Sequence, residues 1–464
     1  MRLSVDEIVK ATGAQVVQGA GGRDVTSVSI DTRTMKAGDL FIAIKGPHFD
    51  GHDFIDEAID KGACGVVISG QWSVISGRRE RWVLQVNDTT HALGDIASMW
   101  RKKVNCTVIA VTGSNGKSTT KEMIAAGLSE TRKVKKTEGN FNNLIGLPLQ
   151  VLDIMPEHEV AVLEMGMSAE GEIRRLTKIA NPDIGLITNV NPAHLEKLHT
   201  VENVAHAKGE LFETMRADGA IVINAEDAWA SRLGEGYQGK KVSFGMQNGC
   251  DVQFGRMISE GLDKTDLTFY VKGREYAVSL NIPGVHNVMN ALASFATGLA
   301  YGVSPLTMIP GLEKFSPMKM RMERIQLSNG VQLINDSYNA NPSSMNAALR
   351  TVCAAKKAGR FIAVLGDMLE LGETSSEKHK ELGQAAADYG VSKLFVIGSH
   401  ANDVANGAKT KGLNSTNIVI GDDVENIKRA VLAELKTGDV VLVKGSRGMK
   451  MERVVEFIKD NIGA

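Results

Sequence analysis

The sequence predicts an α/β protein built from three domains, and three observations lead to this fold class. At 464 residues the chain exceeds a single typical core. Strand-like and helix-like patterns alternate along most of it, which is typical of parallel sheets covered by helices. The hydrophobic content of 43% and charged content of 23% are those of a soluble globular protein. A basic stretch at 100–103 suggests the first boundary, and we expect domains over 1–104, 105–314 and 315–464.

The first predicted domain opens with a helix and contains a short strand-rich region. Ser4 and Glu7 have the spacing of a capping box, and the N-terminus lacks the apolar core of a signal peptide. An apolar run at 40–44 predicts a strand, and the Gly/Asp loop after it is a typical place for ligand-binding groups. Asp31 and Arg33 lie upstream, where a surface turn with an ion pair is as good an interpretation as a ligand contact.

The second predicted domain contains a largely parallel sheet with a late antiparallel insertion. Four strands with helical periodicity between them are predicted at 108–112, 160–163, 184–188 and 220–223. The segment 267–280 predicts a hairpin that turns at Lys272 and Gly273. A long amphipathic helix should follow at 287–299.

The third predicted domain repeats a strand-then-helix unit five times, which suits a doubly wound sheet. The strands are expected at 331–334, 361–365, 394–397, 418–420 and 440–443. Polar residues at 336, 366–367 and 444–447 follow three of these strands, so the ligand edge of the sheet should be polar. No G-x-G-x-x-G follows the first strand, and a dinucleotide is therefore not expected there.

Charge and cysteine content exclude several classes of protein. A net charge of −1 indicates neither a nucleic-acid-binding surface nor an anionic-membrane surface. No apolar run approaches the ~18 residues of a membrane span. The cysteines occur singly and are expected to be small buried apolar residues in a reduced, cytoplasmic protein; they are Cys64, Cys106, Cys250 and Cys353.

The most informative motif is Thr-Gly-Ser-Asn-Gly-Lys-Ser-Thr at 112–119, between a β-branched run and a predicted helix. Glycines let backbone N–H groups turn toward an anion, and the helix N-terminus adds a favourable dipole. Lys117 would reach the β- and γ-phosphates, and the Ser118 hydroxyl would hold Mg²⁺. A strict phosphate-loop pattern has glycine where this chain has Val111, and an ordinary Gly-rich turn is the competing interpretation. The predicted nucleotide-binding residues are Gly113, Ser114, Asn115, Gly116, Lys117, Ser118 and Thr119.

Polar residues after two further strands suggest cation sites beside this loop. Glu164 ends one strand and His194 follows another, so both should lie at the same sheet edge as Ser118. A histidine alone is more often structural, but this set favours a second divalent ion. Two cations suit the attack of a carboxylate on a triphosphate, because both reactants are anionic. Lys208 lies on a probable helix, where a solvated surface lysine is the alternative.

Two pairs of asparagines are further candidates. Asn142 and Asn143 belong to an Asn-dense loop that could donate amides to phosphates or a sugar, or could cap a helix. Asn287 and Asn290 are three apart and share one helix face, which suits an adenine edge. A plain N-cap is the competing account of Asn287.

Taken together, these motifs resemble those of the Mur ligases. The loop at 112–119, Glu164 in Glu-Met-Gly-Met-Ser, His194 after Asn-Pro-Ala, and His-Asn-x-x-Asn at 286–290 occur in the order that this family uses. The resemblance spans all three segments. Motifs at 336–342, 366–372 and 444–447 look like those of the member that adds D-alanyl-D-alanine, and the Asp-Asn-Pro-Arg motif of the diamino-acid-adding ligase is absent. The chain departs from the family's usual residues at Asn191, 197–199 and 317–321.

The resemblance implies an ATP-dependent amide ligase of cytoplasmic peptidoglycan synthesis. The expected substrates are ATP with Mg²⁺, UDP-MurNAc-tripeptide and D-Ala-D-Ala, and an acyl phosphate is the expected intermediate. A monomer is expected, with no nucleic-acid partner and no membrane insertion. Two alternatives stay open: another ligase of the family with a different amine substrate, and a nucleotide-binding switch or scaffold without turnover.

The family also implies roles for the three domains and for individual residues. The domains would bind the UDP-sugar, ATP and the incoming dipeptide, in that order. Because the assigned residues are spread over three segments, the C-terminal domain should swing in about a hinge at 314–321, where Pro317 interrupts the chain. The implied catalytic residues are Lys117, His194, Lys208 and Arg447, and the implied metal ligands are Ser118, Glu164 and His194. Lys208 would be carbamylated. Nucleotide contacts would fall to Asn287, Asn290, Arg321 and Asp336, and substrate contacts to Ser29, Asp31, Arg33, Asp50, Asn142, Asn143 and Ser446.

Overall fold

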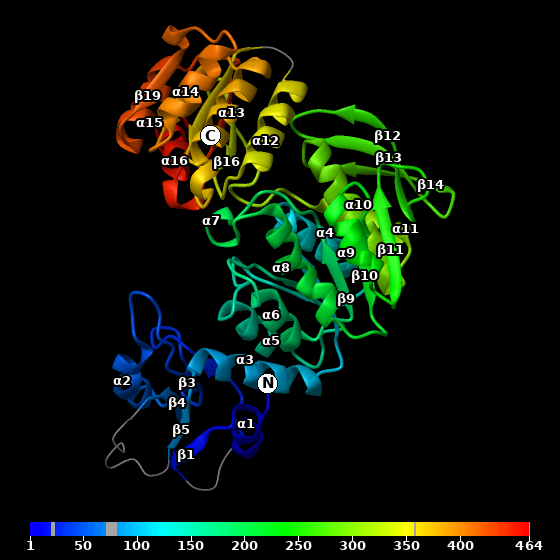
Figure 1. The fold of residues 1–464 in the computed structure, drawn as a ribbon, viewed down its shortest axis with the longest axis vertical. Helices are drawn as coiled ribbons and strands as arrows, with labels where there is room; N and C mark the ends of the chain where they lie inside the picture. The colour runs from blue at the N-terminus through cyan, green and yellow to red at the C-terminus, as the bar shows by residue number, and fades with distance from the viewer. Residues whose placement is uncertain (20–23, 71–80, 357–358, 464) are drawn as a thin grey trace.

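The computed structural model describes residues 1–19, 24–70, 81–356 and 359–463, and it contains three successive sheets with helices packed on them (Figure 1). The blue N-terminal region and the orange C-terminal region lie at opposite ends of the view, with the green central region between them. The predicted α/β class with a central parallel sheet is therefore confirmed. The exact domain boundaries and the roles of the domains stay predictions.

The N-terminal sheet has five strands in the order β1-β5-β4-β3-β2, in which only the β1–β5 pair is antiparallel. The predicted capping box is present: the Ser4 hydroxyl accepts from the Glu7 N–H at 3.2 Å, and the Glu7 carboxylate accepts from the Ser4 N–H at 2.9 Å. The strand expected at 40–44 ends two residues earlier. The elements are α1 (Val5–Thr12), β1 (Gln15–Gln18), β2 (Val28–Ser29), β3 (Leu40–Ile42), η1 (Gly51–Phe54), α2 (Ile55–Asp60), β4 (Gly65–Ser69) and β5 (Trp82–Val86).

Helix α3 (Thr89–Lys103) joins the first sheet to the central region, and its last turn is partly buried. Trp100 is 6% exposed and Arg101 is 7% exposed, although the sequence suggested a polar boundary here. The Arg101 guanidinium donates to the Ala180 carbonyl at 2.8 Å and pairs with Asp183 at 3.1 Å. A cation can be buried here because carbonyls and a carboxylate of the central region satisfy its donors.

The central sheet has nine strands in the order β14-β13-β12-β11-β10-β9-β6-β8-β7. All pairs from β7 to β12 are parallel, and β12, β13 and β14 form an antiparallel extension. The predicted strands and hairpin are present, whereas β7, β11 and β12 were missed. The strands are β6 (Thr107–Thr112), β7 (Val134–Lys136), β8 (Val160–Glu164), β9 (Ile184–Ile187), β10 (Ala220–Asn224), β11 (Lys240–Gly245), β12 (Val252–Glu260), β13 (Thr265–Val271) and β14 (Arg274–Leu280).

Strand β6 is buried on both faces, as a parallel sheet between two helix layers requires. Val108 and Ala110 pack into one apolar core, and Ile109 and Val111 pack into the other. Helices α10 and α11 pack against α4 on the second side. The helices are α4 (Lys117–Ser129), α5 (Gly146–Leu152), α6 (Glu172–Ala180), α7 (Leu195–Leu198), α8 (Val201–Thr214), α9 (Ala228–Glu235), α10 (Val285–Tyr301) and α11 (Pro305–Lys314).

The C-terminal sheet has six strands in the order β15-β16-β20-β17-β18-β19, and all pairs except β15–β16 are parallel. The five predicted strands are confirmed, and the antiparallel edge strand β15 was missed. The strands are β15 (Glu323–Gln326), β16 (Gln332–Asp336), β17 (Phe361–Gly366), β18 (Lys393–Ile397), β19 (Ile418–Gly421) and β20 (Val440–Lys444). The helices are α12 (Pro342–Ala355), η2 (Gly372–Thr374), α13 (Ser375–Asp388), α14 (Ala401–Thr410), η3 (Ser415–Asn417), α15 (Val424–Glu434), η4 (Arg447–Met449) and α16 (Glu452–Ile462).

Two composition-based expectations can be compared with this fold. Among the described residues, no helix is both long and apolar enough to cross a membrane. All four cysteines are free, but only Cys106 is buried, and Cys64, Cys250 and Cys353 are half-buried. The expectation that each is buried was therefore wrong for three of them, because single-residue spacing does not reveal how neighbouring elements cover a side chain.

Candidate active site

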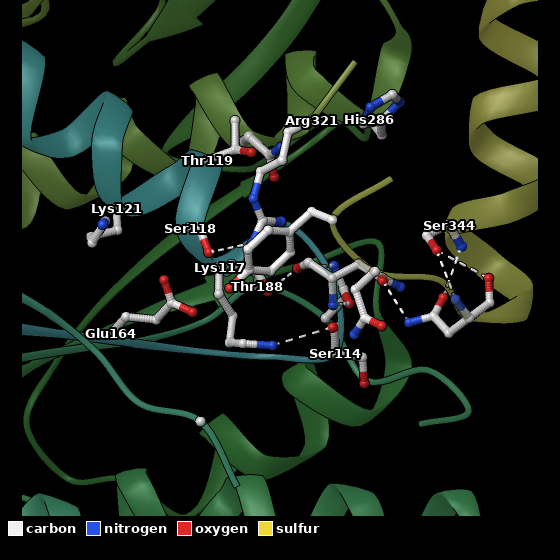
Figure 2. Close-up of a pocket in the computed structure, with 18 of the residues that line it drawn as sticks. Ser114, Lys117, Ser118, Thr119, Lys121, Glu164, Thr188, His286, Arg321 and Ser344 are labelled. Atoms are coloured by element: carbon white, nitrogen blue, oxygen red, sulfur yellow. Dashed lines mark hydrogen bonds between the residues drawn. The ribbon is translucent and has the colours of Figure 1, made fainter. Parts of the chain in front are cut away.

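A cavity of about 1480 Å³ lies where the carboxyl ends of the central strands meet the C-terminal domain. Strands β6 and β8 contribute the phosphate loop and Glu164, and β16 and β20 contribute Asp336 and Lys444 from the other side. The cavity collects most of the predicted site residues: Ser114, Asn115, Gly116, Lys117, Ser118, Thr119, Asn142, Asn143, Glu164, His194, Lys208, Asn287, Asn290, Arg321, Asp336 and Arg447. Figure 2 shows part of this arrangement.

The phosphate loop has the conformation that its glycines predict. Helix α4 begins at Lys117, directly after Gly116 in the left-handed region with φ of 79°. A Cβ at Gly116 would lie 2.4 Å from the Asn290 amide oxygen, and a Cβ at Gly113 would lie 1.9 Å from the Thr188 hydroxyl. Both positions therefore require glycine. Helix α4 has no side-chain cap, so its first-turn N–H groups are available to an anion.

Lys117 folds back over the loop. Its Nζ donates to the Gly113 carbonyl at 2.7 Å. It also donates to the Ser114 carbonyl at 3.3 Å, as Figure 2 shows. Burial lowers the pKa of Lys117, and the nearby Glu164 carboxylate opposes that shift. The side chain is partly enclosed.

Glu164 combines deep burial with an unused oxygen. The residue is 3% exposed, and its Oε1 accepts from the Asn142 amide at 2.8 Å. Its Oε2 has no hydrogen-bond partner among the residues that the structure describes. A buried carboxylate oxygen without a partner is costly unless a cation satisfies it, so this position fits a divalent ion.

The donors around Glu164 also indicate which kind of cation fits. In the described parts of the chain, no three His, Cys, Asp or Glu side chains group together as in a protein-made metal centre. Mg²⁺ usually takes one or two carboxylates and completes its shell with water and substrate phosphates. A site made by Glu164 and the Ser118 hydroxyl beside a phosphate loop therefore suits Mg²⁺ better than a structural metal.

Arg321 reaches from the C-terminal side into the phosphate site. Its Nη2 donates to the Ser118 hydroxyl at 2.9 Å (Figure 2), and its guanidinium lies 3.9 Å from the centroid of the Tyr338 ring. A guanidinium over an aromatic face is held by a cation–π interaction. Tyr338 was not predicted as a site residue, although its place two residues after strand β16 could have indicated it.

Lys208 is buried, so the alternative of a solvated surface lysine is wrong. The residue is 2% exposed on helix α8, whose inner face packs into the central core. Burial lowers its pKa well below the ordinary value, and the neighbouring Lys117 charge adds to the shift. A lysine with a depressed pKa carries more of the neutral amine, which is the nucleophilic form.

Asn287 and Asn290 form a buried amide chain that supports the loop. Helix α10 has Gly284 as its N-cap, so the N-cap interpretation of Asn287 is wrong. The Asn290 amide donates to the Asn287 oxygen at 3.0 Å, and the Asn290 oxygen accepts from Thr120 at 3.1 Å. These amides line the cavity while tying α10 to α4; contact with adenine stays a prediction.

The C-terminal side of the cavity is charged. Asp336 pairs with Lys444 at 2.6 Å and accepts from the Met322 N–H at 3.0 Å. Arg447 lies at the cavity and pairs with Glu452 at 3.1 Å. Contact of Asp336 with a nucleotide and of Arg447 with a second substrate stay predictions.

Ser446 does not line the cavity. Its hydroxyl accepts from the Leu369 N–H at 2.8 Å and donates to the Ala340 carbonyl at 3.3 Å. The side chain is 3% exposed, so it joins two loops of the C-terminal domain.

The sequence did not predict the residues that make contacts across the domain boundary. The Asn341 amide donates to the Asn115 side-chain oxygen at 2.7 Å, which connects helix α12 to the phosphate loop. The His194 ring lies 2.6 Å from the Glu370 carboxylate, and this hydrogen bond lowers the pKa of Glu370. Both Asn341 and Glu370 belong to motifs that the sequence singled out, but nothing local assigned them a partner.

The predicted substrate residues of the first domain are apart from this cavity. Asp31 and Arg33 form an ion pair at 2.7 Å that lowers the pKa of Asp31 to about 2, and Arg33 is 85% exposed. Ser29 bonds to the Asp31 backbone, and Asp50 bonds to His52. None of Ser29, Asp31, Arg33 and Asp50 lines the cavity, and their contact with a substrate stays a prediction.

Asn142 and Asn143 both line the cavity, beside Glu164 and the phosphate loop, and their contact with a substrate stays a prediction. Asn142 supports Glu164, and the Asn143 oxygen accepts from the Ile145 and Gly146 N–H groups at the start of α5. Asn143 therefore caps the start of helix α5, as one of the two interpretations of the sequence predicted.

The fold and the cavity define a class of protein. A phosphate loop at the end of a parallel strand, a buried acid beside it, and an arginine from the next domain form an interdomain site for a nucleoside triphosphate. Comparisons with known proteins identify the family. The description "Mur ligase middle domain" matches residues 111–298, "Mur ligase, glutamate ligase domain" matches 320–447, and "Mur ligase family, catalytic domain" matches 24–101.

Relatives match nearly the whole chain. The UDP-N-acetylmuramoyl-tripeptide–D-alanyl-D-alanine ligase of Bacillus subtilis is 38% identical over 93% of each chain. A crystal structure of MurF from Acinetobacter baumannii superposes with a TM-score of 0.91, 28% identity and 99% coverage of each chain. MurF from Thermotoga maritima in complex with ADP gives a TM-score of 0.83 and 30% identity over 95% of this chain and 99% of that one. The chain belongs to the Mur ligase family, as its motifs predicted.

Proposed function

We propose that this protein is the ATP-dependent ligase that joins D-alanyl-D-alanine to UDP-N-acetylmuramoyl-tripeptide in peptidoglycan synthesis. The observation that carries the proposal is the cavity in which Lys117, Glu164 and Arg321 meet from two domains. The names of relatives that match over nearly the full length support the choice of substrates.

The chemistry requires activation of a carboxylate, which is a poor acyl donor until it is phosphorylated. Lys117 and Arg321 would neutralise the charge that builds on the transferred phosphoryl group. Mg²⁺, held by Ser118 and Glu164 with His194 at a second ion, would supply further positive charge beside the phosphates. The partial enclosure of Lys117 keeps it in a low-dielectric site, where its charge acts more strongly.

Lys208 would contribute as a carbamate. Its buried amine has a depressed pKa, so the neutral form is available to add to carbon dioxide. The C–N bond forms, the nitrogen releases one proton to solvent, and a carbamate anion is left near the second metal position. The carbamate would also give the Lys117 ammonium a negatively charged neighbour in place of a neutral amine.

Asn287, Asn290 and Asp336 would bind the nucleoside, and Arg447 would lie near the acyl phosphate and the dipeptide. The UDP-sugar would bind to the first domain through Ser29, Asp31, Arg33 and Asp50. Because these residues lie in different domains, the reaction needs closure about a hinge at 314–321. Closure would also exclude water from the acyl phosphate. Small-angle scattering should show a more compact protein with ATP and UDP-tripeptide than without; identical dimensions at saturating ligand would contradict closure.

The proposal includes a cytoplasmic, monomeric enzyme with a part in cell-wall biogenesis, cell shape and cell division. ATP and a UDP-linked precursor are cytoplasmic substrates, which supports this location. Free cysteines are compatible with a reducing compartment.

The test is phosphate release by the purified protein with ATP, Mg²⁺ and UDP-MurNAc-tripeptide. D-Ala-D-Ala, a diamino acid and glutamate are offered separately as the amine. Release and peptide-bond formation with D-Ala-D-Ala alone are expected. Turnover with another amine would assign the chain to a different member of the family, and tight nucleotide binding without turnover would indicate a scaffold.

A further inference from the structure

One contact between the central and C-terminal domains has no assigned role. His194 directly precedes helix α7, and Glu370 lies in the loop after strand β17. The His194 Nδ1 lies 2.6 Å from the Glu370 Oε2, and the Glu196 N–H donates to the Glu370 carbonyl at 3.1 Å. In Figure 1, α7 lies next to the C-terminal domain, and α7 also contacts η2.

Both partners have an unusual backbone conformation. His194 has a φ of 56° and Glu370 has a φ of 65°, in the left-handed region that residues with a Cβ rarely adopt. Such residues persist where the surrounding structure holds them, and they cluster at functional sites. Here two of them meet across a domain boundary at the edge of the cavity.

The C-terminal domain holds the Glu370 loop firmly. The Met368 N–H donates to His379 at 2.9 Å, and the Leu369 N–H donates to the Ser446 hydroxyl at 2.8 Å. Leu371 is 3% exposed and packs into the domain core. The carboxylate is therefore presented from a fixed loop rather than from a free surface chain.

The contact determines which ring nitrogen of His194 carries the proton. An ionised carboxylate can only accept, so Nδ1 must donate the hydrogen bond. In the neutral ring Nε2 is then unprotonated and can accept a proton or coordinate a cation. His194 itself lines the cavity.

We propose that Glu370 is a positioning residue that selects the His194 tautomer with a free Nε2 when the C-terminal domain docks. Histidines that bind metals commonly use their other nitrogen in this way, and the partner orients the ring. Because Glu370 belongs to the domain that moves, closure of that domain brings Glu370 to His194. The tautomer of His194 is therefore fixed only when the domain has closed. The placement of His194 beside the second metal rests on the proposed function.

The competing account is an ordinary surface ion pair. The Glu370 side chain is 55% exposed, and exposed pairs contribute little to stability. The two accounts require different chemical properties of the side chain at position 370. An ion pair needs its charge, whereas tautomer selection needs only an acceptor oxygen, which glutamine also has.

The direct test is nitrogen NMR of the full-length protein labelled at histidine, recorded at a mildly alkaline pH. The His194 signals are assigned by their loss in His194→Gln. In the wild type and in Glu370→Gln the proton should be on Nδ1, and in Glu370→Ala it should move to Nε2. Glu373→Ala, which removes an exposed acid in the adjacent helix η2, is the matched control and should match the wild type. A wild-type proton on Nε2, or no change in Glu370→Ala, would overturn the proposal.

Kinetics provide a second readout. Glu370→Ala should lower kcat and raise the Mg²⁺ concentration for half-maximal activity, each by about 10-fold or more, with KM for D-Ala-D-Ala unchanged. Glu370→Gln should restore most of both, and equal losses in the two variants would support the ion pair instead. If the wild type does not ligate D-Ala-D-Ala, the proposed function fails, while the NMR result still decides the role of Glu370.

Discussion

The phosphate loop and the Asp31–Arg33 turn were both predicted as binding regions, but their side chains are satisfied in opposite ways. Around the loop, Lys117, Glu164 and Lys208 are buried or enclosed, and contacts arrive from a second domain. In the first domain, Asp31 pairs with its near neighbour Arg33 in an exposed turn. A buried charged group that lacks a hydrogen-bond or charge partner is stabilised when a ligand supplies one. An exposed ion pair already has its partners and gains less from a ligand.

Among the predictions that test this difference, replacement of the loop lysine should have the largest effect on activity. Lys117→Ala should lower acyl phosphate formation by about 10²–10³-fold or more, because the transferred phosphoryl group loses its nearest fixed cation. Phosphate release and thermal melting are measured together, and the fold should be retained. Lys133→Ala, an exposed lysine of the same domain, is the control. Wild-type turnover in Lys117→Ala would remove the loop from the catalytic site.

The buried lysine should have the next largest effect. Lys208→Ala should reduce activity by about 100-fold, and high bicarbonate should not restore it. A small carboxylic acid should restore part of it by replacing the lost anion. Intact mass of the wild type under gentle conditions should show the carbamate. An unmodified amine in the ATP complex would contradict this role.

His286, a half-buried histidine that lines the cavity, gives a prediction about pH. Burial lowers the pKa of His286 to about 4, so the unfolded chain binds more protons than the folded protein between about 4 and its ordinary value of 6.5. Stability should therefore fall as the pH falls through this window, by on the order of 1–3 kcal/mol.

Denaturant unfolding at several pH values measures this loss. His286→Gln should remove most of it, whereas His206→Gln should not, because His206 is 62% exposed. An unchanged pH dependence in His286→Gln would assign the loss to other groups.

The smallest effect should come from the exposed turn. Arg33→Ala should change the free energy of unfolding by less than about 1 kcal/mol. If the turn binds the UDP-sugar, KM for that substrate should rise roughly 10-fold with kcat nearly unchanged. Arg2→Ala, which breaks an exposed pair with Asp24, is the matched control. An unaltered KM in Arg33→Ala would leave the turn as a structural pair.

The sequence by itself determined most of the elements and the loop that binds phosphate. The capping box at Ser4, the hairpin at Lys272 and the helix start after Gly116 depend on neighbours a few residues away, so local patterns predict them. Strands buried on both faces are also readable as apolar runs. Two of the strands that were missed, β7 and β15, are short edge strands with half-exposed residues.

Tertiary structure alone decided which side chains share the site. Tyr338 under Arg321, Asn142 on Glu164 and Glu370 on His194 join residues far apart in the chain. The burial of Lys208 likewise depends on what covers helix α8. No local periodicity encodes these relations, because they arise when elements separate in the chain pack together, within a domain or across a domain boundary.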